Sequence, residues 1–308
     1  MGERPPPAPA ALQRRPQAVA FALLAAFLWA SYYLFILELK GTISFSALMA
    51  WPFLVGGVAY GIWAYARGEL PRLIGAFGEA WTWIRVLLFY ATQALVLGIA
   101  LSGGPIDSAL LSLVGDVILT PLLARAVVGE GRGLLASPGF LLGMGLSASG
   151  ASLTILQGGS AEPLAGFLVL GALALPFILA VYFVSAAGAN RDHPISSVAG
   201  GAALGAAGVS FLLAPLSPGG WAGLWIGPTP LLLLGICGVV TFLIGPELYF
   251  RAIRKAGLTL PALLMAAIPV FTLGFTVLAT GTYPAPLGLL GIPVAALGAW
   301  FAVRATGD

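Results

Sequence analysis

Ten apolar stretches follow one another along this chain, and their length limits what it can fold into. Each holds about 20 mostly apolar residues, the length an α-helix needs to cross a bilayer. Of the 308 residues, 59% are hydrophobic and only 8% are charged, whereas about a quarter are charged in a soluble domain. The sequence therefore predicts an all-α integral membrane protein with ten transmembrane helices. The predicted spans are 17–37, 44–66, 81–101, 106–126, 136–157, 163–186, 195–215, 229–251, 258–279 and 285–305.

Lysine and arginine gather on one side of these predicted spans. If the N-terminus is cytoplasmic, 13 of the 14 basic residues lie on the cytoplasmic side, and Lys40 alone lies on the other. Because cytoplasmic loops are enriched in Lys and Arg, this bias predicts that both termini are cytoplasmic and that the number of spans is even. The cytoplasmic set is Arg4, Arg14, Arg15, Arg67, Arg72, Arg85, Arg125, Arg132, Arg191, Arg251, Arg254, Lys255 and Arg304.

Residues 1–16 are proline-rich and polar, which predicts a disordered cytoplasmic tail rather than a signal peptide. The pI is near 9.2, but the net charge is only +3 and the basic residues are scattered through short loops. Nucleic-acid binding is therefore not indicated. The chain has one cysteine, Cys237, and one histidine, His193. They leave no cluster for zinc or haem, and no cofactor or metal is expected.

A gapless alignment of residues 88–128 with residues 241–281 indicates an internal repeat. In this alignment Phe89 meets Phe242, and spans three and four fall on spans eight and nine, which run in the opposite direction. Two inverted five-helix repeats are a known transporter plan, with the substrate site near the middle of the bilayer. The predicted units are a tail at 1–16, a first repeat at 17–157 and a second repeat at 163–305.

Three segments carry a resemblance to a known family. They are FLWASYYLF at 27–35, Gly129-Glu130 after the fourth span, and ELYFRAIRKAGLTLPALLMAAIPVFTLGF at 247–275. This pattern resembles the drug/metabolite transporter superfamily, specifically its EamA-type members. The resemblance implies ten helices in two inverted repeats around a central cavity, alternating access, and transport of small metabolites. The chain departs from the family at position 116, where Asp116 stands in place of the usual proline that would mirror Pro269.

Asp116 lies in the middle of the fourth predicted span. An aspartate at this depth costs about 2.5–3.5 kcal/mol on insertion scales, so it usually faces a cavity or a partner. Ser108, Ser112, Asp116 and Thr120 are spaced four apart and form one slowly winding polar stripe. The stripe indicates a substrate or proton path. The alternative is a packing aspartate that hydroxyls of neighbouring helices satisfy.

Other polar and aromatic side chains in the spans extend this predicted path. Gln93 and Tyr90 lie in the middle of the third span, where an amide can hydrogen-bond a substrate or can join helices. Tyr33 and Trp51 lie in the first two spans. They are candidates to face an aromatic substrate, although packing or a place in an interfacial aromatic belt is the alternative.

Glu247 lies four residues before Arg251, at the predicted cytoplasmic end of the eighth span. One interpretation is a structural i,i+4 ion pair near the membrane interface. The other is a gate or proton-binding carboxylate. Pro246 favours a local break in this helix that frees a backbone carbonyl toward the cavity. We therefore take Glu247, Arg251, Pro246 and Pro269 as candidate gate residues.

The sequence patterns favour a secondary carrier over several other function classes. No phosphate-binding G-x-x-x-x-G-K-[ST] loop occurs, so the chain itself does not hydrolyse ATP. Intramembrane proteolysis would need two facing aspartates or an HExxH zinc motif, neither of which is indicated. A channel would need a repeated ring of carbonyls or charges. No enzymatic activity is expected, and an intramembrane enzyme is the remote alternative.

The sequence therefore predicts a secondary transporter of small polar metabolites. Amino acids, including aromatic ones, are the favoured substrates, and sugars, nucleosides or cationic drugs are the alternatives. We expect a multi-pass protein of a bacterial inner membrane that exports its substrate by alternating access. The expected partners are the small-molecule substrate and the lipid bilayer, with protons as a candidate coupling ion. The chain is expected to be a monomer or a homodimer.

Overall fold

A computed structural model describes residues 9–102, 104–130, 137–157, 166–281, 283 and 286–305. Within these ranges the chain is helical and contains no β-strand. The long helices are α1 (Pro9–Leu39), α2 (Phe45–Ala66), α4 (Ala80–Ser102), α5 (Pro105–Val114), α7 (Pro138–Gln157), α8 (Gly166–Asp192), α9 (Gly201–Leu213), α10 (Pro228–Val239), α11 (Gly245–Ala256), α13 (Ala267–Thr280) and α14 (Pro286–Ala305). The short ones are α3 (Leu70–Ala76), α6 (Thr120–Leu123) and α12 (Thr259–Leu264).

Eight helices or helix runs of the described chain are long and apolar enough to cross a membrane. They overlap the predicted spans one to four and six to nine. They are Arg15–Leu39, Phe45–Ala66, Ala80–Ser102, Pro105–Val128, Leu173–Asp192, Ser196–Leu216, Pro228–Ala256 and Thr259–Thr280. The two other predicted spans, 136–157 and 285–305, coincide with the helices α7 and α14. The chain is thus a multi-pass membrane protein, while ten crossings and cytoplasmic termini remain predictions.

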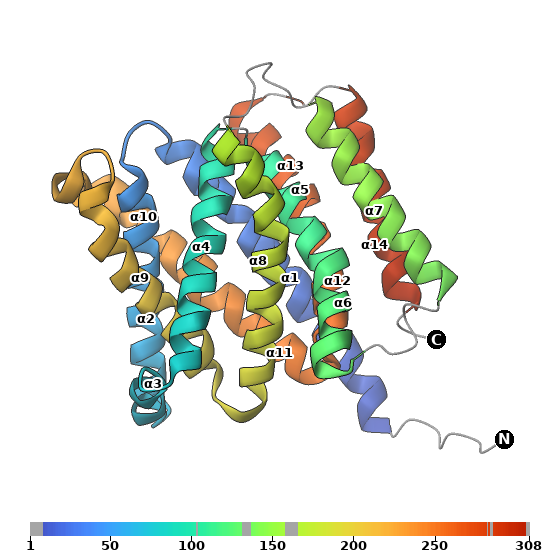
Figure 1. Cartoon of the computed structure of the whole chain (residues 1–308), viewed down its shortest axis with the longest axis horizontal. Helices are drawn as coiled ribbons and strands as arrows, with labels where there is room; N and C mark the ends of the chain where they lie inside the picture. Colours follow the sequence, from blue (N-terminus) through green and yellow to red (C-terminus); the bar gives the residue numbers. More distant parts are fainter. Residues whose placement is uncertain are drawn as a thin grey trace.

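The N-terminal tail is only partly within the described residues. Residues 1–8 lie outside them, and α1 begins at Pro9, before position 17 where the first span was expected. A proline is tolerated in the first turn of a helix because the N–H it lacks would have no partner there. In Figure 1, α1 begins and α14 ends at the same lower end of the molecule.

Four of the described spans contain a turn that is not α-helical; one is the π-helical turn Ser196–Gly200, and in the other three an interruption lies about one turn before a proline. π-Helical turns occupy Gly115–Leu119 before Pro121 and Val240–Ile244 before Pro246. The third interruption separates α12 from α13 just before Pro269. Proline lacks an N–H and clashes with the carbonyl four residues earlier, so the preceding turn loses its regular ladder. These interruptions place irregular backbone in the middle of the helix bundle.

Glycines allow the helices to approach closely. A Cβ atom on Gly56 of α2 would lie 2.8 Å from the Gly238 carbonyl oxygen of α10, and one on Gly143 of α7 would lie 2.6 Å from the Ala302 nitrogen of α14. The backbones of these helix pairs are therefore nearly in contact, as small residues permit in membrane bundles. Figure 1 shows α7 and α14 side by side at one edge of the bundle.

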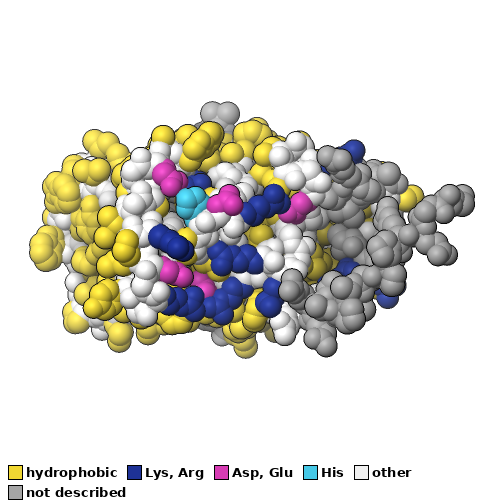
Figure 2. Space-filling view, turned by 90° about the horizontal axis from the view of Figure 1, so that it is seen from below, with side chains coloured by type: hydrophobic (Ala, Val, Ile, Leu, Met, Phe, Trp, Pro, Cys, Tyr) yellow, Lys and Arg dark blue, Asp and Glu magenta, His cyan; other side chains and the backbone are white. Residues whose placement is uncertain are grey.

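The lower end of the molecule carries a group of charged side chains (Figure 2). Figure 2, seen from below, shows Lys, Arg, Asp and Glu side chains gathered in the middle of this face and hydrophobic side chains around it. We call this face the charged end. Its hydrogen-bonded and ion-paired members include Arg67, Glu69, Glu130, Arg191, Glu247, Arg251, Arg254 and Lys255.

Candidate functional site

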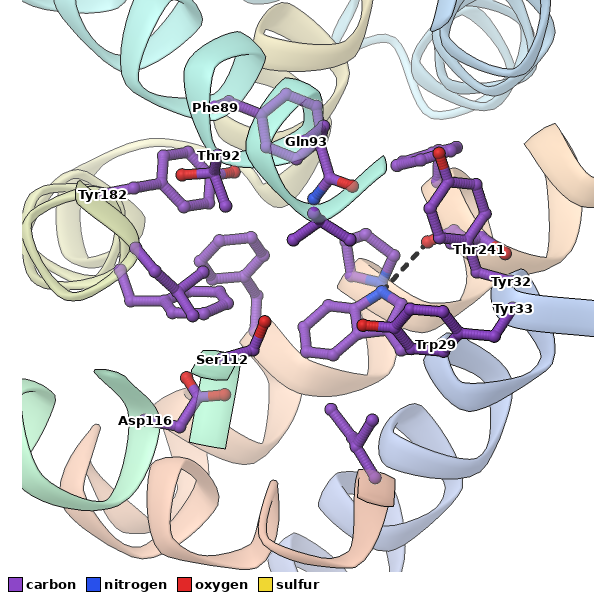
Figure 3. A pocket seen from close by; sticks show the side chains of 17 residues that line it. Trp29, Tyr32, Tyr33, Phe89, Thr92, Gln93, Ser112, Asp116, Tyr182 and Thr241 are labelled. Carbon is purple, nitrogen blue, oxygen red and sulfur yellow. Dashed lines mark hydrogen bonds between the residues drawn. The ribbon is translucent and has the colours of Figure 1, made fainter. Parts of the chain in front are cut away.

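A cavity of about 80 Å³ lies among α1, α4, α5, α8, α11 and α13. Its walls include the three spans that are interrupted before a proline. The lining residues are Trp29, Tyr32, Tyr33, Phe89, Thr92, Gln93, Val96, Ser112, Asp116, Leu179, Tyr182, Phe183, Thr241, Phe242, Pro246, Phe250 and Ile268. Figure 3 shows side chains from several helices converging on this space. Most are apolar or aromatic, with few polar groups, which is the usual make-up of a small-molecule site.

Asp116 is held at the cavity by the close approach of α5 and α8. A Cβ atom on the preceding residue, Gly115, would lie 2.7 Å from the carbonyl oxygen of Pro176, so only glycine permits this spacing. The π-helical turn starts at the same glycine: the Thr120 N–H bonds to the Gly115 carbonyl. The next carbonyl, that of Asp116, then faces Pro121, which has no N–H to donate.

The Asp116 side chain is 3% exposed. Within the described part of the chain, its Oδ1 atom has no hydrogen-bond partner. The neighbouring hydroxyls do not supply one, because Ser112 donates instead to the Ser108 carbonyl at 2.9 Å. A buried carboxylate oxygen without a donor is unfavourable. Asp116 therefore resembles a group prepared for a ligand more than a packing aspartate satisfied by neighbouring hydroxyls.

The expected polar stripe is buried along its whole length: Ser108, Ser112, Asp116 and Thr120 are each 8% exposed or less. Tyr33 reaches this stripe from α1 and lies 3.4 Å from the Ser108 hydroxyl. Ser108 in turn donates to the Val96 carbonyl of α4 at 2.8 Å. The α5 part of the stripe thus faces α1 and α4.

Gln93 and Thr92 face the cavity from α4 (Figure 3). Among the described residues, the Thr92 hydroxyl has no hydrogen-bond partner. Of the residues predicted to bind substrate, the structure therefore brings Asp116, Gln93, Ser112 and Tyr33 together around one cavity.

Trp29 fixes the opposite wall. The π-helical turn before Pro246 pairs the Gly245 N–H with the Val240 carbonyl, which leaves the Thr241 carbonyl facing the proline. The indole N–H of Trp29 donates to that carbonyl at 3.0 Å. The break expected at Pro246 thus frees a carbonyl, and an aromatic side chain from α1 satisfies it.

Aromatic contacts join the remaining walls. The Trp29 ring lies 5.1 Å from that of Tyr249, and the Phe89 ring lies 5.2 Å from that of Tyr182, measured between centroids. Sequence reasoning missed Trp29, Thr92 and Tyr182 as cavity residues. Trp29 lies in the FLWASYYLF segment, so its position within a family motif was the available signal.

Two residues predicted to bind substrate lie away from this cavity. Tyr90 lines a separate pocket of about 190 Å³ that also includes Ser46 and Ser210. Trp51 donates its indole N–H to the Leu224 carbonyl at 2.9 Å, which fixes α2 to the segment before α10. In this structure Trp51 therefore has a packing role.

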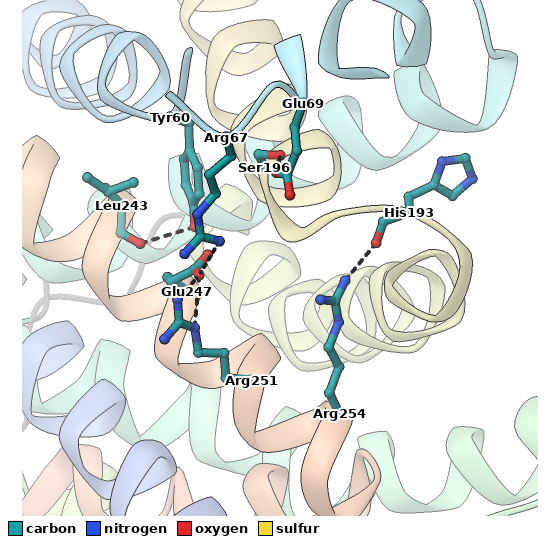
Figure 4. Close-up of polar contacts among 9 residues, drawn as sticks. All are labelled: Tyr60, Arg67, Glu69, His193, Ser196, Leu243, Glu247, Arg251 and Arg254. Carbon is teal, nitrogen blue, oxygen red and sulfur yellow. Dashed lines mark hydrogen bonds and ion pairs between the residues drawn. The ribbon is translucent and has the colours of Figure 1, made fainter. Parts of the chain in front are cut away.

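Glu247 lies at the charged end, one residue after the cavity residue Pro246. Its Oε1 atom accepts two hydrogen bonds from Arg251, at 2.6 and 2.9 Å. Arg67, at the end of α2, lies 3.9 Å from the same oxygen. Figure 4 shows Glu247 between the two guanidinium groups. The i,i+4 pair therefore exists, and a third charge connects it to another helix.

A second contact connects α2 to this broken helix. The Tyr60 hydroxyl donates to the Leu243 carbonyl at 3.1 Å. Of the other candidate gate residues, Pro246 lines the cavity, and Pro269 is buried directly after the cavity residue Ile268. The described residues contain no cluster of three His, Cys, Asp or Glu side chains that could hold a metal ion.

Comparison with known proteins relates the second half of the chain to a family. Residues 166–304 match the EamA-like transporter family, which confirms the family resemblance stated from the sequence over the second half of the chain. A solved structure, titled "Crystal structure of protein", covers 94% of this chain and 97% of its own, with a TM-score of 0.74 and 20% sequence identity. At this identity the likeness shows a shared fold alone. Among curated proteins, none matches the sequence.

Proposed function

We propose that this chain, whose residues 166–304 belong to the EamA-like transporter family, is a secondary transporter for a small metabolite that carries an amino group. The observation that carries the proposal is the buried, unpartnered Oδ1 atom of Asp116 at the wall of the central cavity. An ammonium group would supply the hydrogen-bond donor and the positive counter-charge that this carboxylate lacks.

Amino acids, aromatic ones included, are the first substrates to test. Asp116 would bind the ammonium group, and the aromatic rings of the cavity would contact the side chain. Gln93 and Thr92 provide neutral hydrogen-bonding groups on the facing helix. Sugars and nucleosides fit less well, because each of their hydroxyls would need a partner in a cavity with few polar groups.

Transport would proceed by alternating access between two inverted repeats. The interrupted spans supply irregular backbone where it lines a cavity, as in other secondary transporters. At the charged end, the contacts of Arg67 and Tyr60 with the α10–α11 run would close one route to the cavity. We propose export across a bacterial inner membrane, with the charged end on the cytoplasmic side.

The test uses purified protein in liposomes loaded with candidate amino acids and amines. We expect Asp116→Asn to lower transport at least about tenfold, the effect of losing one charged hydrogen bond. Asp107→Asn is the matched control, since Asp107 lies on the same helix but does not line the cavity. Unchanged transport by Asp116→Asn would remove the carboxylate from the mechanism. Repeating the assay with an imposed pH gradient distinguishes proton exchange from facilitated exchange.

A further inference from the structure

We infer that the cavity selects amines over the corresponding amino acids: it binds a compound with an ammonium group and an apolar or aromatic body, and it disfavours a carboxylate on that compound. This inference rests on the proposed function and narrows its substrate class. It follows from the charges, donors and rings that the cavity presents.

The first observation is the charge of the lining. Among the 17 described residues that line the cavity, Asp116 is the only one with a formal charge, and none is lysine, arginine or histidine. A bound ammonium group would therefore find a counter-ion, whereas a bound carboxylate would not. A charge that leaves water without a counter-ion or several hydrogen bonds is strongly disfavoured.

The nearby guanidinium groups are already engaged elsewhere. Arg85 lies one turn before the cavity residue Phe89 on α4. It donates to the Thr82 hydroxyl at 2.9 Å and lies 4.0 Å from the Glu79 carboxylate. At the charged end, Glu247 engages both Arg67 and Arg251. These three arginines therefore already have partners outside the cavity.

Two of the polar donors on the wall are also occupied. The Trp29 indole donates to the Thr241 carbonyl, and the Tyr33 hydroxyl donates to Ser108. The neutral groups left for a substrate include the Gln93 amide and the hydroxyls of Thr92, Tyr32 and Tyr182. These donors can hydrogen-bond a carboxylate, but none of them carries the positive charge that makes a hydrogen bond to a carboxylate strong.

The aromatic walls of the cavity also favour an ammonium group over a carboxylate. Eight of the lining residues are aromatic, and the face of an aromatic ring carries partial negative charge. Such faces attract an ammonium group through cation–π contact and repel an anion. The aromatic lining residues are Trp29, Tyr32, Tyr33, Phe89, Tyr182, Phe183, Phe242 and Phe250.

The test compares compounds that share one apolar body and differ in the charged groups attached to it. Phenethylamine, phenylalanine and 3-phenylpropanoate share a phenyl ring on a two-carbon chain and carry an ammonium group, both groups, or a carboxylate alone. Binding to the reconstituted full chain is measured by competition and by thermal shift. We expect phenethylamine to bind at least about tenfold more tightly than phenylalanine, and 3-phenylpropanoate to bind most weakly. Isopentylamine and leucine repeat the comparison with an aliphatic body.

Variants connect the preference to the residues that cause it. Asp116→Asn is expected to weaken phenethylamine binding at least about tenfold and to reduce the difference between amine and amino acid. Asp107→Asn is expected to change neither, and the thermal stability of both variants in the absence of ligand controls for folding. Arg85→Gln is expected to leave phenylalanine binding unchanged, because the guanidinium is directed to Thr82 and Glu79.

The outcomes separate the two proposals. Equal binding of amine and amino acid in both compound pairs, or loss of phenylalanine binding in Arg85→Gln, overturns the inference and leaves an amino-group transporter standing. Tight binding of 3-phenylpropanoate also overturns the inference. If neither the amines nor the amino acids bind to the folded protein, the proposed function fails together with the inference.

Discussion

The carboxylate of Glu130 accepts a hydrogen bond from the backbone N–H of Leu258 at 2.8 Å, across 128 positions of the sequence. Leu258 is the N-cap residue of α12. The other Glu130 oxygen lies 3.0 Å from the Arg191 guanidinium at the end of α8. One side chain thus joins the end of the fourth span to the ends of two helices in the second half. The negative charge of this carboxylate also interacts favourably with the partial positive charge at the N-terminus of α12.

Replacing Glu130 with alanine should destabilise the protein by about 0.5–2 kcal/mol, the usual loss for a helix cap. Glu130→Gln keeps an oxygen acceptor and should lose less. Arg191→Gln removes only an ion pair whose arginine is 56% exposed, and such pairs contribute about 0–1 kcal/mol. Thermal unfolding in detergent measures all three. If Arg191→Gln lowers the thermal stability as much as Glu130→Ala does, the ion pair, and not the cap, stabilises this junction.

Gly115→Ala should impair transport, because its Cβ would lie 2.7 Å from the Pro176 carbonyl oxygen and would push α5, with Asp116, away from α8. Overpacking of this kind costs about 1–3 kcal/mol. Gly98→Ala on α4 is the matched control, since its Cβ would meet no other atom within 4 Å. Transport rate and thermal stability are measured together. Normal transport by Gly115→Ala would mean that the position of Asp116 tolerates the shift.

Glu247→Gln should loosen the closed route at the charged end, since it weakens the contacts with both Arg251 and Arg67. Phe250→Cys, in a Cys237→Ser background, places a thiol on the cavity side of the same helix. A charged thiol reagent should modify it several-fold faster when Glu247→Gln is added, as expected for losing about 0.5–1 kcal/mol of ion pairing.

The control for this experiment is Arg254→Gln. Arg254 donates to the Asn190 and His193 carbonyls at the other side of the charged end, so its loss should not change thiol modification. If both variants accelerate the reaction equally, the effect comes from general loosening. If Glu247→Gln has no effect, the pair with Arg251 is only structural.

Gly143→Ala should destabilise the α7–α14 pair, because its Cβ would lie 2.6 Å from both the Ala302 nitrogen and the Gly298 oxygen. Those backbone atoms cannot move without separating the helices, and we expect a loss of about 1–3 kcal/mol. Gly145→Ala on the same helix meets nothing within 4 Å and should be neutral. Unfolding curves of the two variants in detergent that coincide would contradict this close contact.

Local patterns in the sequence predicted much of the fold. The length of the apolar stretches predicted the spans that the structure describes as long apolar helices, and the four-residue spacing of Ser108, Ser112, Asp116 and Thr120 predicted one face that is indeed buried. Both patterns depend on the period and rise of a single helix, which are the same in any context. The break expected at Pro246 also follows from one residue and is present as a π-helical turn.

The composition of the cavity could not be predicted in the same way. Thr92, Trp29 and Tyr182 meet there because three helices pack with particular rotations, and no local spacing encodes those rotations. Tyr90, two residues before Thr92, illustrates the limit: it faces a different pocket because neighbouring residues on a helix point in different directions. Trp51 was an aromatic candidate whose partner, the Leu224 carbonyl, lies 173 positions away.

The broken helix between α10 and α11 has a consequence for how the molecule moves. Its Thr241 and Leu243 carbonyls are bonded by Trp29 and Tyr60, and its Phe242 ring packs against Tyr32 and Phe53, so hydrogen bonds and ring contacts together join this turn to α1 and α2. Each hydrogen bond contributes about 0.5–1.5 kcal/mol, and each aromatic pair contributes about 0.5–1.5 kcal/mol beyond the area it buries. Any movement of this turn against α1 or α2 would have to break several such weak contacts together.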